Sequence, residues 1–253
     1  MSGVWLGILG PLRVVSESGS ATVTAGKQRV ILAALMVRAG QAVRWDELAE
    51  FVWDGAPPKH ARVALRNYVM RLRNALGRTA GSRIVTRGHG YVLEAAENEV
   101  DTARFVALCR SGGDAVRVDW SRARHDLRDA LTLWRGEPFV DIPSETLRRE
   151  EVPRLEQWHL QAWEWRIETD LRLGCHEELL PELAALADQH PLRERFHAQL
   201  MLALHRSGRQ AEALSIYQRI RRRLADELGV DPCRELRVAH QQVLTGDVAS
   251  PLT

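Results

Sequence analysis

Residues 57–76 read PPKHARVALRNYVMRLRNAL, and this stretch decides how the rest of the chain is interpreted. At about 100° per residue, its apolar residues gather on one side of a helix and its cations and amides on the other. The predicted core side consists of Ala61, Leu65, Tyr68, Val69, Leu72, Ala75 and Leu76. The opposite side consists of Lys59, Arg62, Arg66, Asn67, Arg71, Arg73 and Asn74. Pro58 suits the first turn of this helix, where the missing amide hydrogen costs nothing.

The basic helix lies within a segment that has no carboxylates, since no Asp or Glu occurs from Gly55 through Leu93. Exposed helices ordinarily mix charges, because opposite charges three or four residues apart attract. A face with only positive charge repels itself, and a polyanion would remove that cost. The alternative is a solvated, arginine-rich helix without a partner, which is common. The charge pattern alone leaves both interpretations open.

The whole chain has 253 residues, of which 45% are hydrophobic and 27% are charged, so it can form one large or two ordinary globular domains. Its net charge of +2 hides an asymmetry. Residues 1–95 hold 13 Lys+Arg against 6 Asp+Glu, whereas the remainder holds 22 against 27. This difference in charge predicts that the N-terminal part binds a polyanion and that the C-terminal part has a different function.

The sequence gives no sign of secretion, membrane insertion or catalysis. The N-terminus lacks the pattern of a signal peptide, and no run approaches the ~18 apolar residues of a membrane span. Three distant cysteines, Cys109, Cys175 and Cys233, suit a reducing cytoplasm. There is no GxxxxGK[ST] loop, and no further metal ligands accompany Cys175-His176. We therefore expect a cytoplasmic protein that is not an enzyme, without catalytic residues, metal or cofactor.

The front part predicts a winged helix-turn-helix. The expected elements are strands within 5–15 and at 21–24, helices at 27–38 and 45–53, the basic helix, and a hairpin at 83–93. The last helix of such a motif enters the major groove, and the hairpin is the wing. Arg87, at the wing tip, is expected to reach the DNA backbone or the minor groove. His89 either contacts phosphate when protonated or serves only as a turn residue.

From Asp101 to about Leu244 the chain predicts consecutive helices, interrupted at Gly136–Pro153 by a loop or short helix. A spacing of 34 residues superposes GCHEELLPELAAL on GRQAEALSIYQRI, which is the period of tetratricopeptide repeats. Such an array holds a peptide or protein, or serves as a dimer surface or spacer. The predicted domains are a winged-helix DNA-binding domain at 1–97, an all-α tetratricopeptide-like domain at 98–245 and a flexible tail at 246–253.

Several motifs together resemble the SARP family, the Streptomyces antibiotic regulatory proteins. They are LGPLRV at 9–14, GKQRVILAALMVRAG at 26–40, the basic helix, and VTRGHGY at 85–91. In the back part, the stretch 166–214 and LADELGVDP at 224–232 resemble the family's bacterial transcriptional activator domain. The resemblance covers nearly the whole chain.

The resemblance implies an OmpR/PhoB-type winged helix, and an activator that binds double-stranded DNA at direct repeats and contacts RNA polymerase holoenzyme through its sigma and alpha subunits. By position, the expected DNA contacts are Arg62, Arg66, Asn67, Arg71, Arg73 and Arg87. Met70 stands where a related domain often carries a cation, so it is expected to meet a thymine methyl group. Residues 44–47 lack the Ser or Thr cap of relatives, so the helix at 45–53 is expected to have a less fixed start.

The charge and helix patterns predict a DNA-binding protein with no membrane partner. The resemblance implies that it is a transcriptional activator of antibiotic biosynthesis genes and that it binds DNA as a head-to-tail homodimer. Lys59, Arg62, Arg73 and Arg87 are assigned to phosphates. Arg66, Asn67 and Arg71 are assigned to bases. The competing hypothesis is a helical-repeat scaffold that binds a ligand or protein, with a front domain that binds protein.

Overall fold

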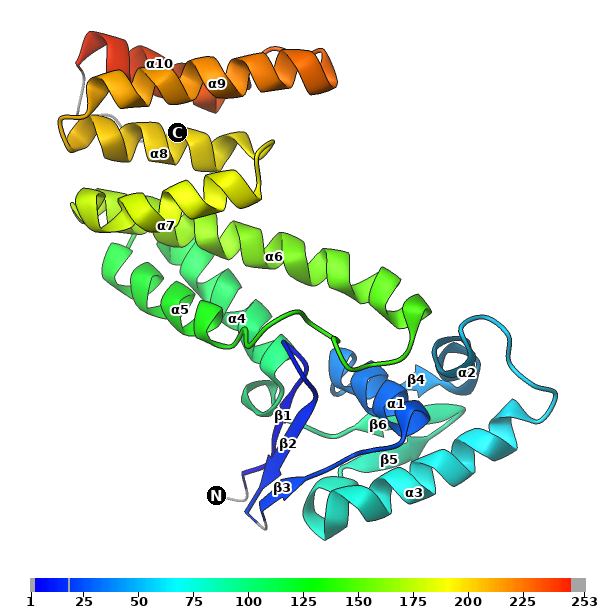
Figure 1. The fold of residues 1–253 in the computed structure, drawn as a ribbon. Coiled ribbons are helices and arrows are strands. Elements are labelled where there is room, and N and C mark those ends of the chain that lie inside the picture. Colours follow the sequence, from blue (N-terminus) through cyan, green and yellow to red (C-terminus); the bar gives the residue numbers. More distant parts are fainter. Residues whose placement is uncertain (1–2, 18, 247–253) are drawn as a thin grey trace. The chain divides into compact units, whose positions relative to one another are not determined.

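The front of the chain forms a winged helix in the computed structural model, which describes residues 3–17 and 19–246 (Figure 1). Its first element is an antiparallel sheet with the order β1-β2-β3. The strands are β1 (Trp5–Gly7), β2 (Arg13–Ser16) and β3 (Gly19–Ala21). The strand predicted at 21–24 is therefore placed too late in the sequence, because Gly19 already pairs with Ser16.

Three helices form the core of the winged helix. They are α1 (Gly26–Val37), α2 (Trp45–Trp53) and α3 (Ala61–Gly81). α1 is buried without a break from Val30 to Met36, so it forms the centre of this core. α2 begins and ends where the sequence predicts. Its first turn carries Asp46 and Glu47, which lie at the positive end of the helix dipole.

α3 begins at Ala61, which corrects the prediction that Pro58 lies in its first turn. Pro57 and Pro58 are exposed and lie in an irregular segment, and a turn at Lys59 and His60 separates them from the helix. The carbonyl of Pro58 accepts a hydrogen bond of 3.0 Å from the amide of Ala61.

The buried side of α3 matches the predicted periodicity except at its margin. The fully buried residues ahead of its last turn are Leu65, Val69, Leu72 and Leu76. Ala75, predicted for the core side, is exposed because it lies at the edge of that side. Gly77 leaves the helical conformation with φ 74° and ψ 179°, so a kink separates the last turn of α3 from the rest.

A second antiparallel sheet, with the order β4-β6-β5, supplies the wing. Its strands are β4 (Val43–Arg44), β5 (Ile84–Arg87) and β6 (Gly90–Leu93). β5 and β6 form the predicted hairpin, with Gly88 and His89 as its turn. Such a turn favours positive φ, which Gly88 supplies at 53°. β4 is too short to give an alternating pattern, so the sequence did not predict it.

The rest of the described chain is helical after a single 3₁₀ turn at Glu97–Glu99. Its helices are α4 (Asp101–Ala115), α5 (Trp120–Thr132), α6 (Glu145–Arg172), α7 (His176–Gln189), α8 (Glu194–Arg206), α9 (Gln210–Leu228) and α10 (Arg234–Thr245). α7 and α9 begin 34 residues apart, after Gly174 and Gly208, which have φ of 86° and 76°. The predicted repeat is therefore present in the backbone.

The interruption predicted at Gly136–Pro153 is shorter than expected. The chain is a loop only as far as Ser144, and α6 then continues through Pro153. Proline removes one hydrogen bond and costs ~3 kcal/mol in a helix interior. The remaining hydrogen bonds and the buried side of this 28-residue helix offset that cost.

The described chain falls into two compact units. Unit 1 comprises the residues up to Ser111 together with Asp126–Ala162, and unit 2 comprises Gly112–His125 together with the chain from Trp163 onward. The start of α4 thus belongs to the same unit as the winged helix. The domain boundaries predicted at 97 and 245 stay predictions, and the predicted tail lies, apart from Gly246, outside the described residues.

Asp101 fastens the start of α4 to the N-terminal sheet within unit 1. Its buried carboxylate accepts hydrogen bonds from the amides of Ile8 and Leu9, at 2.8 and 2.9 Å. Burial raises the pKa of this carboxyl group, and the two amides and Arg135 oppose the rise. Because three donors, the amides of Ile8 and Leu9 and the guanidinium of Arg135, meet at one buried carboxylate oxygen, α4 and the sheet are expected to move together.

Within residues 3–17 and 19–246, no helix is long and apolar enough to cross a membrane. No group of three or more His, Cys, Asp or Glu side chains in these residues could hold a metal ion.

Candidate nucleic-acid interface

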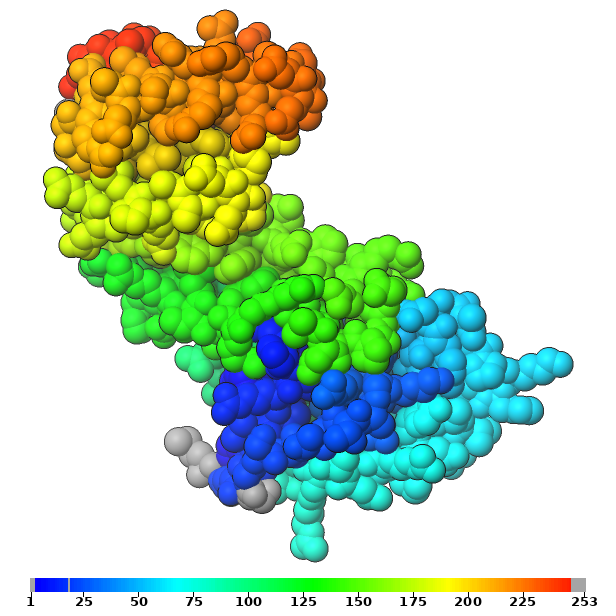
Figure 2. Space-filling model, in the orientation of Figure 1, coloured from blue at the N-terminus to red at the C-terminus, as the bar shows by residue number. Residues whose placement is uncertain are grey.

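The exposed side of α3 carries most of the side chains predicted to meet DNA. Arg62, Arg66, Asn67 and Arg71 are exposed, whereas Arg73 is half-buried. This follows from the helical period, because the buried residues occupy the opposite side. Figure 2 shows the segment in light blue and cyan, which contains α3, as a continuous part of the surface of unit 1.

A hollow of about 640 Å³ lies between α3 and the wing. The lining residues from α3 are Arg62, Val63, Arg66, Asn67, Met70 and Arg73. The hollow is completed by Trp45, Thr86, Gly88 and Tyr91. Four of the eight predicted contact residues therefore converge on one concave surface.

Positive charge from α3 converges on Tyr91, which is only 3% exposed. Burial raises the pKa of the Tyr91 hydroxyl, and the charges of Arg73, Arg66 and Arg62 oppose this rise. The hydroxyl is neutral near pH 7, so the three guanidinium groups are not compensated by a phenolate. This side of the hollow therefore favours an anion.

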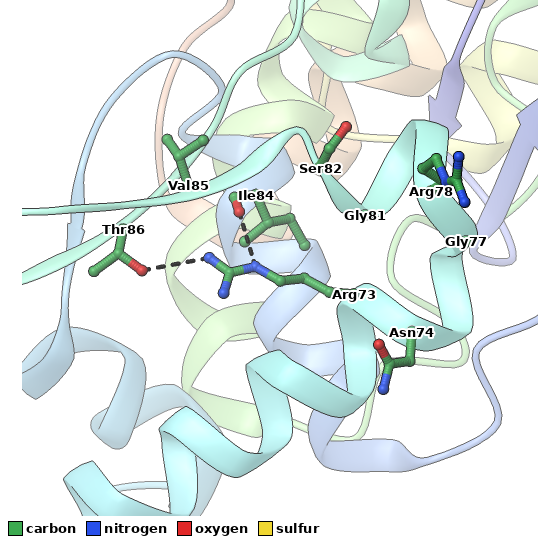
Figure 3. Close-up of a pocket in the computed structure, with 9 residues that line it drawn as sticks. All are labelled: Arg73, Asn74, Gly77, Arg78, Gly81, Ser82, Ile84, Val85 and Thr86. Atoms are coloured by element: carbon green, nitrogen blue, oxygen red, sulfur yellow. Dashed lines mark hydrogen bonds between the residues drawn. The ribbon is translucent and has the colours of Figure 1, made fainter.

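Arg73 holds the wing against α3. Its Nε donates a hydrogen bond of 2.9 Å to the Ile84 carbonyl, and its Nη2 donates one of 3.3 Å to the Thr86 hydroxyl (Figure 3). These contacts lie in a second hollow, of about 650 Å³, between the C-terminal part of α3 and β5. Arg73 thus has a structural task in addition to the phosphate contact predicted for it.

Arg87, the predicted wing contact, has an intramolecular partner. Its Nη2 lies 2.6 Å from Oε1 of Glu94, and the two side chains are 66% and 45% exposed. Glu94 is the first carboxylate after the acid-free segment. An ion pair this exposed is weak, so Arg87 can exchange Glu94 for a phosphate at little cost.

The other predicted residues, Lys59, Arg71, Arg87 and His89, do not line the hollow. Lys59 is exposed in the turn before α3, and His89 is exposed at the wing tip. Lys59, Arg66, Asn67 and Arg71 have no hydrogen-bond or ion-pair partner in the described part of the chain. Their donors are therefore available to a ligand.

Val63 and Trp45 are among the residues of the hollow that were not predicted as contacts. Val63 is 59% exposed on α3 and lines the hollow together with Met70, which is 54% exposed. Trp45, in the first turn of α2, lies beneath the Arg62 guanidinium. In the sequence, Val63 could have been identified because it is an apolar residue on the otherwise polar side of the helix. The signal for Trp45 was a large aromatic residue in the first turn of a helix whose start lacks a Ser or Thr cap.

Two family models match this chain. "Transcriptional regulatory protein, C terminal" matches residues 19–93, and "Bacterial transcriptional activator domain" matches residues 100–244. The regulatory protein DnrI of Streptomyces peucetius is 36% identical over 253 residues, which cover 96% of this chain and 92% of DnrI. The chain belongs to the SARP family. This confirms the resemblance found in the sequence.

Other relatives of this SARP chain are longer. The regulatory protein AfsR of Streptomyces coelicolor is 42% identical over 245 residues, which are 96% of this chain and 24% of AfsR. The chain therefore spans about a quarter of the length of that relative. Mycobacterium tuberculosis EmbR, solved in complex with a low-affinity phosphopeptide, matches with a TM-score of 0.89 and 30% identity. That match covers 97% of this SARP chain and 66% of the EmbR chain, which confirms the predicted fold class.

Proposed function

We propose that this SARP-family chain is a sequence-specific, DNA-binding transcriptional activator of secondary-metabolite (antibiotic) biosynthesis genes. It binds direct repeats near promoters and recruits RNA polymerase holoenzyme through the sigma and alpha subunits. Two copies bind head to tail on one face of the DNA, since direct repeats present their sites in the same orientation. It acts in the cytoplasm, where it is associated with the nucleoid.

The observation that carries this proposal is the exposed cationic side of α3 beside the wing. A helix fits the major groove of B-DNA, which is about 12 Å wide. Arg66 and Asn67 line the hollow without partners in the described residues, so their donors are assigned to base edges together with those of Arg71. The phosphate contacts are assigned to Lys59, Arg62, Arg73, Arg87 and His89.

The proposal is tested by fluorescence anisotropy with labelled duplex DNA and by selection of bound sequences from a random library. We expect random duplex to bind at about 50 mM salt with a steep salt dependence. Selected sequences should bind roughly 10³-fold tighter than random ones or better, and should contain a direct repeat. If the chain binds no duplex at low salt, or if selection enriches no sequence, the proposal is wrong.

Replacing Arg87 by Ala is expected to weaken binding to all duplexes alike and to lower the slope of log K against log salt by about 1. Replacing Glu94 by Gln should have the opposite effect on affinity, because it frees Arg87 from its 2.6 Å partner. Both changes are read from anisotropy titrations at several salt concentrations. A salt slope that is unchanged in the Arg87→Ala variant would remove the wing from the interface.

Val63 and Met70 are expected to read thymine methyl groups, because they are exposed apolar side chains on the face assigned to bases. The test replaces each thymine of the selected sequence by deoxyuridine, which lacks only the methyl group. At contacted positions we expect a loss of ~0.8 kcal/mol, or roughly fourfold in affinity. This sensitivity should disappear in Val63→Ala or Met70→Ala at the matching position. Equal sensitivity in wild type and both variants would contradict the assignment.

A further inference from the structure

Trp45 joins three parts of the candidate interface. The guanidinium carbon of Arg62, in the first turns of α3, lies 3.7 Å from the centre of the Trp45 ring. The His89 ring of the wing tip meets the same indole edge-on, with centroids 5.4 Å apart and planes at 74°. The backbone amide of Trp45 also donates a hydrogen bond of 3.0 Å to the His89 carbonyl. One residue of α2 therefore contacts both DNA-reading elements.

The start of α2, which the sequence predicts to be less fixed, is held in place by the wing. The residue before the helix, Arg44, provides no side-chain cap. The wing supplies the missing acceptor, because the His89 carbonyl takes the first amide of α2. The start of α2 and the wing tip are thus fixed to each other by the main chain, and the indole adds a contact between side chains.

The stacking geometry leaves the donors of Arg62 free. A guanidinium over an aromatic face is attracted through its flat side, so its N–H groups point outward around the rim. No hydrogen bond from Arg62 to another described residue competes for them. An arginine that is free in solution loses side-chain conformational entropy when it binds a phosphate. Contact with the indole already restricts the Arg62 side chain, so the entropy cost of binding DNA is smaller.

We propose that Trp45 is a positioning residue for DNA binding, which holds the Arg62 guanidinium at the mouth of the hollow and couples it to the wing tip. The proposal rests on the proposed DNA-binding function. Trp45 need not touch DNA. Its effect passes through Arg62, so the two residues should act as a unit and not independently.

The test is a double-mutant cycle on the full chain, read by anisotropy with the selected duplex. The variants are Trp45→Leu, Trp45→Phe, Arg62→Ala and the double variant Trp45→Leu/Arg62→Ala. Leucine keeps an apolar side chain but removes the aromatic face, and phenylalanine keeps both. We expect Trp45→Leu to bind roughly 3- to 10-fold more weakly and Trp45→Phe to restore most of that loss. When Arg62 is already replaced by Ala, the additional change Trp45→Leu should alter the affinity for DNA by less than about twofold, because the two residues contribute through one shared interaction.

Trp53 provides a matched control. It lies at the other end of α2, and its ring also carries a cation, Lys27, at 4.7 Å. Trp53→Leu should show no coupling to Arg62, and thermal unfolding of each variant separates folding defects from binding defects. Additive losses from Trp45→Leu and Arg62→Ala, or a Phe variant as weak as the Leu variant, would overturn the positioning role while wild-type binding stands. Absence of wild-type binding would instead overturn the DNA-binding function and this role with it.

Discussion

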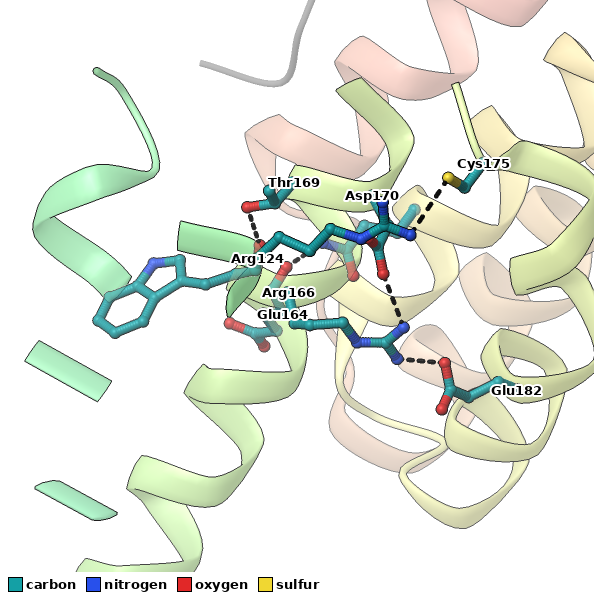
Figure 4. Close-up of polar contacts among 9 residues, drawn as sticks. Arg124, Glu164, Arg166, Thr169, Asp170, Cys175 and Glu182 are labelled. Carbon is teal, nitrogen blue, oxygen red and sulfur yellow. Dashed lines mark hydrogen bonds and ion pairs between the residues drawn. The ribbon is translucent and has the colours of Figure 1, made fainter. Parts of the chain in front are cut away.

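Replacing Asp170 by Asn is expected to lower the free energy of unfolding of the helical repeats by about 3–5 kcal/mol. Asp170 lies in α6 within unit 2 and is fully buried. Its Oδ1 lies 2.8 Å from Nε of Arg124, and its Oδ2 accepts a hydrogen bond of 3.0 Å from Nη1 of Arg166 (Figure 4). The amide keeps the shape of the side chain but removes its negative charge.

The loss is large because the arginines cannot both turn to water. The Arg166 side chain is 7% exposed, and its other nitrogen already pairs with Glu182. The Arg124 side chain is 31% exposed and also donates to the Cys175 thiol, at 3.6 Å. Without the negative charge of Asp170, two positively charged guanidinium groups remain next to the same buried site, and the carboxylate that neutralised them there is lost. Removal of one partner of a buried pair therefore costs far more than the pair contributes as a whole.

The measurement is urea unfolding followed by far-ultraviolet circular dichroism. The matched control is Arg209→Ala in the same unit, which breaks the 2.7 Å pair with Glu212. Both of those side chains are well exposed, so the midpoint of unfolding should stay where it is in wild type. A midpoint for Asp170→Asn as high as that of the control would show that the network is dispensable.

The parts of the fold with local signals could be predicted from the sequence. α2 has apolar spacing and acids in its first turn, and the wing has a glycine-flanked turn between two apolar runs. The buried side of α3 follows from a period of 3.6 residues. The start of α3 was misplaced, because a turn at Lys59 and His60, closed by the Ala61 amide on the Pro58 carbonyl, separates the double proline from the helix.

The side-chain partners could not be predicted, since they depend on residues that folding brings together. The sequence marks Arg87 as a cation at a wing tip, but its pairing with Glu94 depends on how the two strands are aligned. The stacking of Arg62 on Trp45 depends on the packing of α3 against α2. The sequence therefore identifies the cations on the polar side of α3 and on the wing, and the fold decides which of them line the hollow and which also make contacts within the protein.

Replacing Arg66 by Ala is expected to lower affinity for the selected sequence by about 1–3 kcal/mol, or roughly 5- to 150-fold, and to reduce discrimination against random duplex. Arg66 is exposed on α3, lines the hollow and has no hydrogen-bond or ion-pair partner among the described residues. Its planar guanidinium can donate two hydrogen bonds to one guanine, which no other base pair accepts in the same way. The measurement compares anisotropy titrations of the selected and random duplexes at one salt concentration.

Arg78→Ala separates base reading from general charge. Arg78 is also an exposed arginine of α3, but it lies beyond the kink at Gly77 and lines the second hollow, between α3 and β5. Its loss removes the same charge from the same helix, so any effect should be similar on both duplexes. Arg66→Ala should instead weaken the selected duplex much more than the random one and relax the preference at one base pair. If Arg66→Ala reduced affinity for both duplexes by the same factor, Arg66 would be a phosphate contact, and the reading of bases would have to rest on Asn67 and Arg71.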